Sequence, residues 1–153
     1  MLRLALAWLH LLALGFGLGA VLDRAASLRG PMTTQTLRRV FRADTVWGLA
    51  AALWIATGVW RVVAQTEKAT TYYMRNPLFW TKMGLLAVIL LLELGPMITL
   101  IRWRIAAARG APPEVYARPS LARRMATISR IEAALVIVMV AAAVAVARGY
   151  GTR

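Results

Sequence analysis

The sequence contains no cysteine, and this absence excludes several kinds of site. Disulfides, iron–sulfur clusters, thiolate metal sites and covalently attached CxxCH haem all require cysteine. Histidine is nearly absent as well, because His10 is the single residue of its kind. Acidic residues are scarce, with 6 Asp and Glu against 19 Lys and Arg, so the formal net charge is +13. Any haem in this protein would therefore be bound non-covalently.

Long apolar runs are abundant, since 60% of the 153 residues are hydrophobic. Four runs cover residues 4–22, 45–63, 80–101 and 131–147. As helices, they reach about 25 to 33 Å, enough to cross a hydrocarbon core about 30 Å thick. The first run is longer than the apolar core of a signal peptide, which favours a retained span. The sequence predicts an all-α transmembrane four-helix bundle and a single integral membrane domain over residues 1–153.

The positive charges are unevenly divided between the two predicted sides of the membrane. Segments 23–44 and 102–130, which share one side, carry twelve Arg, whereas the termini and the segment 61–79 together carry six Lys and Arg. Positive charge collects on the cytoplasmic side during insertion, so both termini are predicted to lie outside. We expect a multi-pass protein of a bacterial inner membrane. Because the cations sit at span ends and not on one soluble face, nucleic acid is not an expected partner.

Three basic residues are predicted to lie at similar depth in the outer half of the membrane. They are His10 in the first run, Arg61 at the end of the second and Lys82 near the start of the third. Ionisable residues inside spans are candidates for functional sites. Together they would form a pocket for an anionic ligand, such as a haem propionate or a quinone oxygen. The alternatives are a neutral His10 that hydrogen-bonds a neighbouring helix and a Lys82 that reaches the headgroups by itself.

Glu93 is a further candidate, because a carboxylate near the middle of a span is costly unless it is protonated or paired. It follows Lys82 by eleven residues, which places both on one helix face. Pro96 comes three residues later and is predicted to kink the helix. Glu93 could form a proton or ligand site, or a buried hydrogen bond that orders the bundle. Three other acids are interpreted as members of exposed interfacial ion pairs, namely Asp23 with Arg24, Asp44 with Arg42 and Glu132 with Arg130.

Helix ends and close contacts can be predicted from single residues. Thr33 or Thr34 is expected to cap the helix that leads into the second run, and Ser120 the one that leads into the fourth. Gly15 and Gly19, four residues apart, are predicted to allow close helix approach.

Several motifs resemble those of a family of small four-span bacterial membrane proteins of unknown function. The resemblance covers nearly the whole chain and is most specific in the segment EKATTYYMRNPLFWTK, residues 67–82. The chain departs from the family pattern at Ala69, where glycine is usual, and at Glu93 and Met97, where serine and threonine are expected. The other matching positions are Arg42-Ala43-Asp44, Gly58, Arg61, Pro96 and Arg102-Trp103-Arg104.

A more remote resemblance links the layout to HemJ-type protoporphyrinogen oxidases and CopD-like membrane domains. The shared features are Leu9-His10 in the first span, Trp80 and Lys82 opening the third, and Arg130 and Glu132 entering the fourth. The resemblance implies that His10 is an axial ligand of haem b iron and that Lys82 is a partner for a propionate or a substrate carboxylate.

Three functions follow from these observations. The first is a b-type haem-binding redox protein, with His10 as ligand and Arg61 or Lys82 as propionate partners. The second is a non-catalytic subunit or scaffold that packs against a membrane-protein partner, or against itself, through Gly15 and Gly19. The third is transport of protons or small molecules past Glu93.

Overall fold

The computed structural model describes residues 1–65 and 68–151. Four long helices form its body, and each is long and apolar enough to cross a membrane. The predicted all-α bundle of four apolar spans is thus confirmed. Two short helices occupy the connections. In chain order the helices are α1 (Leu2–Ser27), α2 (Thr34–Val63), α3 (Thr70–Arg75), α4 (Pro77–Ala108), α5 (Pro113–Tyr116) and α6 (Pro119–Ala147).

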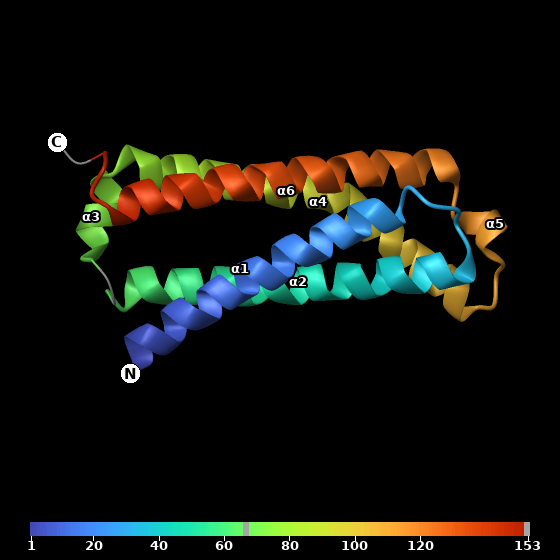
Figure 1. Cartoon of the computed structure of the whole chain (residues 1–153), viewed down its shortest axis with the longest axis horizontal. Helices are drawn as coiled ribbons and strands as arrows, with labels where there is room; N and C mark the ends of the chain where they lie inside the picture. Colours follow the sequence, from blue (N-terminus) through green and yellow to red (C-terminus); the bar gives the residue numbers. More distant parts are fainter. Residues whose placement is uncertain (66–67, 152–153) are drawn as a thin grey trace.

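The long helices are arranged as two pairs (Figure 1). α1 packs along α2 and α4 packs along α6, while α1 also contacts α6 and so joins the pairs. The N-terminus, the end of the described chain and α3 lie at one end of the bundle, which we call the terminal end. α5 and the loop between α1 and α2 lie at the other, which we call the loop end. The backbones of α2 and α4 seldom come close to each other, and the closest backbone approach between the two pairs is that of α1 to α6.

The helix ends confirm one predicted cap and contradict another. Thr33 caps α2, and its hydroxyl accepts a hydrogen bond from the Thr36 amide at 3.2 Å. Ser120 does not cap α6, because that helix begins one residue earlier at Pro119, with Arg118 at the N-cap. Proline suits the first helical position, since its missing N–H would be unpaired there in any case. The sequence prediction overlooked this preference.

Pro96 lies inside α4, which continues as a helix through residue 108. Asn76, directly before the first helical residue Pro77, caps α4. Its side-chain oxygen accepts from the Leu78 amide at 2.9 Å, and its amide nitrogen donates to the Tyr150 carbonyl at 2.9 Å. Asn76 is fully buried and thus ties the start of α4 to the segment after α6.

Close packing of α1 on α2 depends on a glycine that the sequence analysis did not select. A Cβ on Gly17 would lie 3.3 Å from the Ala50 Cβ and 3.4 Å from the Trp47 ring. Gly15 and Gly19 instead face outward, and a Cβ on either would meet nothing within 4 Å. The predicted close approach at Gly15 and Gly19 is therefore wrong within the single chain. The reason is helical geometry, because residues two apart point to different sides of a helix.

Candidate functional site

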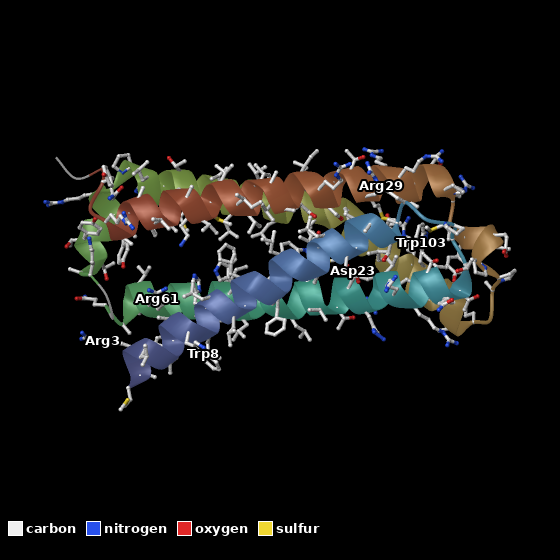
Figure 2. All side chains as sticks on the ribbon, viewed as in Figure 1. Arg3, Trp8, Asp23, Arg29, Arg61 and Trp103 are labelled. Atoms are coloured by element: carbon white, nitrogen blue, oxygen red, sulfur yellow. The ribbon has the colours of Figure 1, made fainter. Side chains whose placement is uncertain are left out.

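At the terminal end, a cavity of about 310 Å³ opens between the two helix pairs. His10 from α1, Arg61 from α2 and Lys82 from α4 all line it, so the predicted convergence of these three residues is present in the fold. Figure 2 labels Arg61 on α2 in this half of the molecule, while Trp8 lies on the outer side of α1. Tyr73 of α3 contributes to the same wall, and α6 supplies an apolar side that includes Met139.

A second hollow of about 170 Å³ adjoins the first, between α2 and α4. The two share their central residues, so we treat them as one site and call it the terminal cavity. The shared lining residues are His10, Trp54, Gly58, Val62, Phe79, Lys82 and Met139. A mostly apolar wall with a few polar groups is typical of pockets that bind small molecules or cofactors.

The imidazole of His10 is held in one orientation by Thr57. Its Nδ1 lies 2.9 Å from the Thr57 hydroxyl oxygen. That hydroxyl also lies 2.8 Å from the Leu53 carbonyl and 3.1 Å from the Trp54 carbonyl, which can only accept hydrogen bonds. The single Thr57 hydroxyl proton is therefore directed at the backbone, and we infer that Nδ1–H of His10 donates to Thr57. In a neutral imidazole, Nε2 then keeps its lone pair for another partner.

Two residues of α2, Gly58 and Trp54, lie close to the His10 ring. A Cβ on Gly58 would lie 3.2 Å from the His10 Cε1, so glycine at this position gives the ring its room. The Trp54 ring lies 5.5 Å from the imidazole, centroid to centroid, with a tilt of 31°. Its indole nitrogen is buried and has no hydrogen-bond partner among the residues that the structure describes. A ligand with an acceptor atom could satisfy this donor.

All charged side chains in the described wall of the terminal cavity are cations. Arg61, Lys68 and Lys82 line it, and no acidic side chain does so among the described residues. The Lys68 ammonium also lies over the Tyr72 ring, 4.0 Å from its centroid. Cations in an apolar, partly buried wall favour an anionic group, because its charge offsets theirs where water is scarce.

A second polar site lies toward the loop end, and we call it the Arg24 cluster. Arg24 is fully buried, and all five of its N–H donors are used. Its Nε donates to Ser129 at 3.0 Å, Nη1 to Asp44 and Glu93 at 2.9 and 2.7 Å, and Nη2 to Glu93 and Glu132 at 2.7 and 2.9 Å. These partners come from α2, α4 and α6, so one side chain of α1 connects all four spans.

Arg104 adds a second cation at the edge of the Arg24 cluster. Its Nη2 lies 2.9 Å from the second carboxylate oxygen of Asp44 and 2.6 Å from the Phe41 carbonyl. Arg104 is partly exposed, with 36% of its side-chain surface accessible, whereas Arg24 and Glu132 are at 0%. The centre of the cluster is therefore inaccessible to solvent, whereas its edge at Arg104 is partly accessible.

The predicted exposed ion pairs are wrong for three of the acids. Arg24 is bound to Asp44, Glu93 and Glu132, and not to its neighbour Asp23, which lies 4.0 Å from Arg39 instead. The predicted pairs joined residues one or two apart in sequence. Such residues point to different sides of a helix, so their charges find partners on other helices. Interhelix partners depend on how each helix is rotated, which the sequence pattern of one span does not give.

Glu93 and Lys82 share a face of α4 but belong to different sites. Eleven residues of helix separate them by about 16 Å, and the buried Ile89 lies between. Lys82 lines the terminal cavity, while Glu93 forms a bidentate pair with Arg24. Of the two interpretations of Glu93, a buried hydrogen bond that orders the bundle is therefore the one that its contacts match.

A family model for a predicted membrane protein, DUF2214, matches residues 2–151 of the chain. The protein belongs to the DUF2214 family. The matched range includes both the terminal cavity and the Arg24 cluster. No curated protein and no solved structure matches the chain. The likeness of this DUF2214 protein to HemJ-type and CopD-like domains thus stays a prediction, and Glu67, which opens the motif that resembles the family, lies outside the described residues.

The sequence analysis found the terminal cavity of this DUF2214 protein but missed most of the Arg24 cluster. One signal was available: Arg24, Asp44, Glu93 and Glu132 are ionisable residues within or beside apolar runs, with at least one in each span. Charges inside spans generally pair with one another. Among the described residues, no three His, Asp or Glu side chains are placed to hold a metal ion.

Proposed function

We propose that this DUF2214 protein binds b-type haem in the terminal cavity, with His10 as the iron ligand. The observation that carries the proposal is that His10, Arg61 and Lys82, from three different spans, line one cavity. A protein that only packs against lipid has no need to gather its single histidine and two cations inside the bundle. The proposed role is redox or ligand-binding chemistry, and it concerns the half of the membrane in which the termini lie.

The donor set of the cavity fits haem in three respects. His10 presents Nε2 with a lone pair, because Nδ1 is engaged by Thr57. Arg61 and Lys82 supply the positive charge that carboxylate side groups require. Trp54 offers a buried N–H that has no hydrogen-bond partner in the described part of the chain. The volume of about 310 Å³ lies at the lower end of the range of known ligand pockets, and the adjoining hollow extends it toward α2 and α4.

Met139 is the candidate for a second iron ligand. It is fully buried in α6 and lines both parts of the terminal cavity, on the helix pair opposite His10. Haem held by His and Met is typical of electron-transfer proteins, whereas an open sixth position supports binding or activation of a small molecule. When bound, haem would supply one-electron chemistry at its iron. The chain's own residues would hold it, orient it and keep water from its face.

The test is a haem titration of the detergent-purified protein followed by its Soret absorption. The wild type is expected to develop a Soret band that saturates at one haem per chain, and His10→Ala to abolish it. Arg61→Gln and Lys82→Gln should weaken binding severalfold, because each removes one charge partner. Arg75→Gln, an exposed cation at the same end of the bundle, serves as the control and should bind as the wild type does. No band after haem addition, or a band that His10→Ala leaves intact, contradicts the proposal.

We also propose that the terminal end faces the outside of a bacterial inner membrane. The excess of Arg in the segments at the loop end supports this orientation. Because the chain lacks cysteine, single substitutions can report on it. Tyr150→Cys, exposed at the terminal end, should react with an impermeant maleimide on intact spheroplasts, and Glu114→Cys only after lysis. The reverse pattern would contradict the orientation.

A second candidate function, a subunit of a larger membrane complex, is supported by the outer face of α1. Gly15 and Gly19 leave space there for the backbone of another helix, and Leu11 and Phe16 beside them are exposed. Small residues of this kind favour helix association in lipid. Gly15→Leu should then release a co-purifying partner or convert a dimer to a monomer in light scattering. A wild-type protein that is monomeric and free of partners would count against this role.

A further inference from the structure

The Arg24 cluster contains one more negative charge than positive charge if every group is ionised. Arg24 and Arg104 contribute two cations, and Asp44, Glu93 and Glu132 contribute three carboxylates. Among the described residues, no other charged side chain forms an ion pair within this cluster. Its members are Arg24 of α1, Asp44 of α2, Glu93 and Arg104 of α4, and Ser129 and Glu132 of α6. An unbalanced charge is costly where the centre of the cluster is inaccessible to water.

The hydrogen bonds show which carboxyl lacks a partner. Both oxygens of Asp44 accept, one from Arg24 and one from Arg104. Both oxygens of Glu93 accept from Arg24. Glu132 accepts from Arg24 through Oε2 only, and its Oε1 is buried without a hydrogen-bond partner among the described residues. A bare carboxylate oxygen with 0% side-chain exposure is costly, and one proton there would remove the excess charge.

We propose that the Arg24 cluster is a proton-binding site and that Glu132 carries one proton on Oε1 in the resting protein. Glu93 provides the route by which this proton exchanges. The carboxyls of Glu93 and Glu132 are bound side by side to the same Nη2 of Arg24, and Glu93 is 17% exposed whereas Glu132 is at 0%. In the exchange, an O–H bond on Glu93 breaks as one forms on Glu132, and Glu93 returns to its charged pair with Arg24.

Infrared spectroscopy of the detergent-purified protein at neutral pH tests the proposal. The wild type should show the C=O stretch of a protonated carboxylic acid, and this band should shift in D₂O. Glu132→Gln should lose the band. Glu114→Gln, an exposed acid in α5, is the matched control and should keep it. A wild type without the band, or a band that Glu132→Gln leaves in place, overturns the proposal.

A stability measurement keeps the test decisive even if one variant folds poorly. Glutamine resembles a protonated glutamate in shape and charge, so Glu132→Gln should melt like the wild type, whereas Glu93→Gln, which breaks a charged bidentate pair, should melt lower. Equal losses in both variants would mean that Glu132 is ionised. A wild-type melting temperature that rises with NaCl but not with choline chloride, without the infrared band, would mean that a sodium ion takes the place of the proton. Either result overturns the proposal.

Discussion

The two polar sites of the bundle differ in what surrounds their charged groups. In the Arg24 cluster, one guanidinium makes five hydrogen bonds to groups from three other helices. In the terminal cavity, Arg61 and Lys82 line about 310 Å³ of space with no acidic side chain in the described wall. Polar groups that bond to groups on other helices hold helices together in the membrane, whereas polar groups that line an apolar cavity can contact a ligand that enters it.

The two polar sites also differ in how the helix pairs are joined around them. The Arg24 cluster joins the α1–α2 pair to the α4–α6 pair, while the backbones of α2 and α4 seldom come close to each other. At the terminal end the ribbons of the two pairs lie further apart (Figure 1), and the terminal cavity is lined by residues of both pairs. We therefore assign stability mainly to the cluster and ligand binding to the cavity.

Arg24→Gln tests this assignment most severely. Removing one partner of a buried ion pair leaves the other charges uncompensated, which costs about 3–5 kcal/mol. We expect thermal unfolding in detergent, followed by circular dichroism, to shift far to lower temperature. Arg29→Gln, an exposed arginine just beyond α1, is the control and should change little. Equal stability of the two variants would remove the distinction between the cluster and the rest of the bundle.

Asn76→Ala asks how much the terminal end contributes to stability. The substitution removes both the cap of α4 and the hydrogen bond that the Asn76 amide donates to the Tyr150 carbonyl. We expect a loss of about 1–2 kcal/mol, measured as above. Thr33→Ala, which removes an exposed cap at the loop end, should cost less. A loss for Asn76→Ala as large as that for Arg24→Gln would show that the terminal end is equally important for stability.

Thr57→Val separates positioning of His10 from stability. The variant loses the acceptor of the His10 Nδ1–H, at a cost of about 1 kcal/mol. Haem affinity should fall more than stability, because the ring is no longer held in one orientation. Thr81→Val, which loses a similar hydroxyl-to-backbone bond on the exposed side of α4, provides the comparison and should keep its affinity. Unchanged haem binding in Thr57→Val would argue against a role for the His10 orientation.

The smallest expected difference in stability is that between Gly58→Ala and Gly48→Ala. Alanine at position 48 meets nothing within 4 Å and should stabilise α2 by about 0.5–1 kcal/mol through helix propensity. At position 58 the same methyl group lies 3.2 Å from the His10 ring, so most of that gain should be lost and the ring displaced. Melting temperatures and haem titrations of both variants measure the difference. An equal gain in both would mean that the His10 ring moves freely.

The sequence predicted the parts of the fold that depend on one span at a time. The lengths of the apolar runs predicted the four helices, and Thr33 was correctly predicted as a helix cap. The positions of His10, Arg61 and Lys82 along their spans predicted that all three lie at a similar depth, and all three line one cavity. The sequence prediction failed where the rotation of one helix against another decides the contact. Arg24 and Gly17 are the clearest cases, since their partners on other helices cannot be read from spacing within α1.

The most direct test of the central claim is the shift in melting temperature that added haem produces in three proteins. A ligand that binds only the folded state stabilises it by about 2.7 kcal/mol at a hundred times its Kd. We predict a clear rise for the wild type and for Glu132→Gln, whose terminal cavity is intact, and no rise for His10→Ala. A rise of the same size in His10→Ala, or none in the wild type, would contradict the assignment of ligand binding to the terminal cavity.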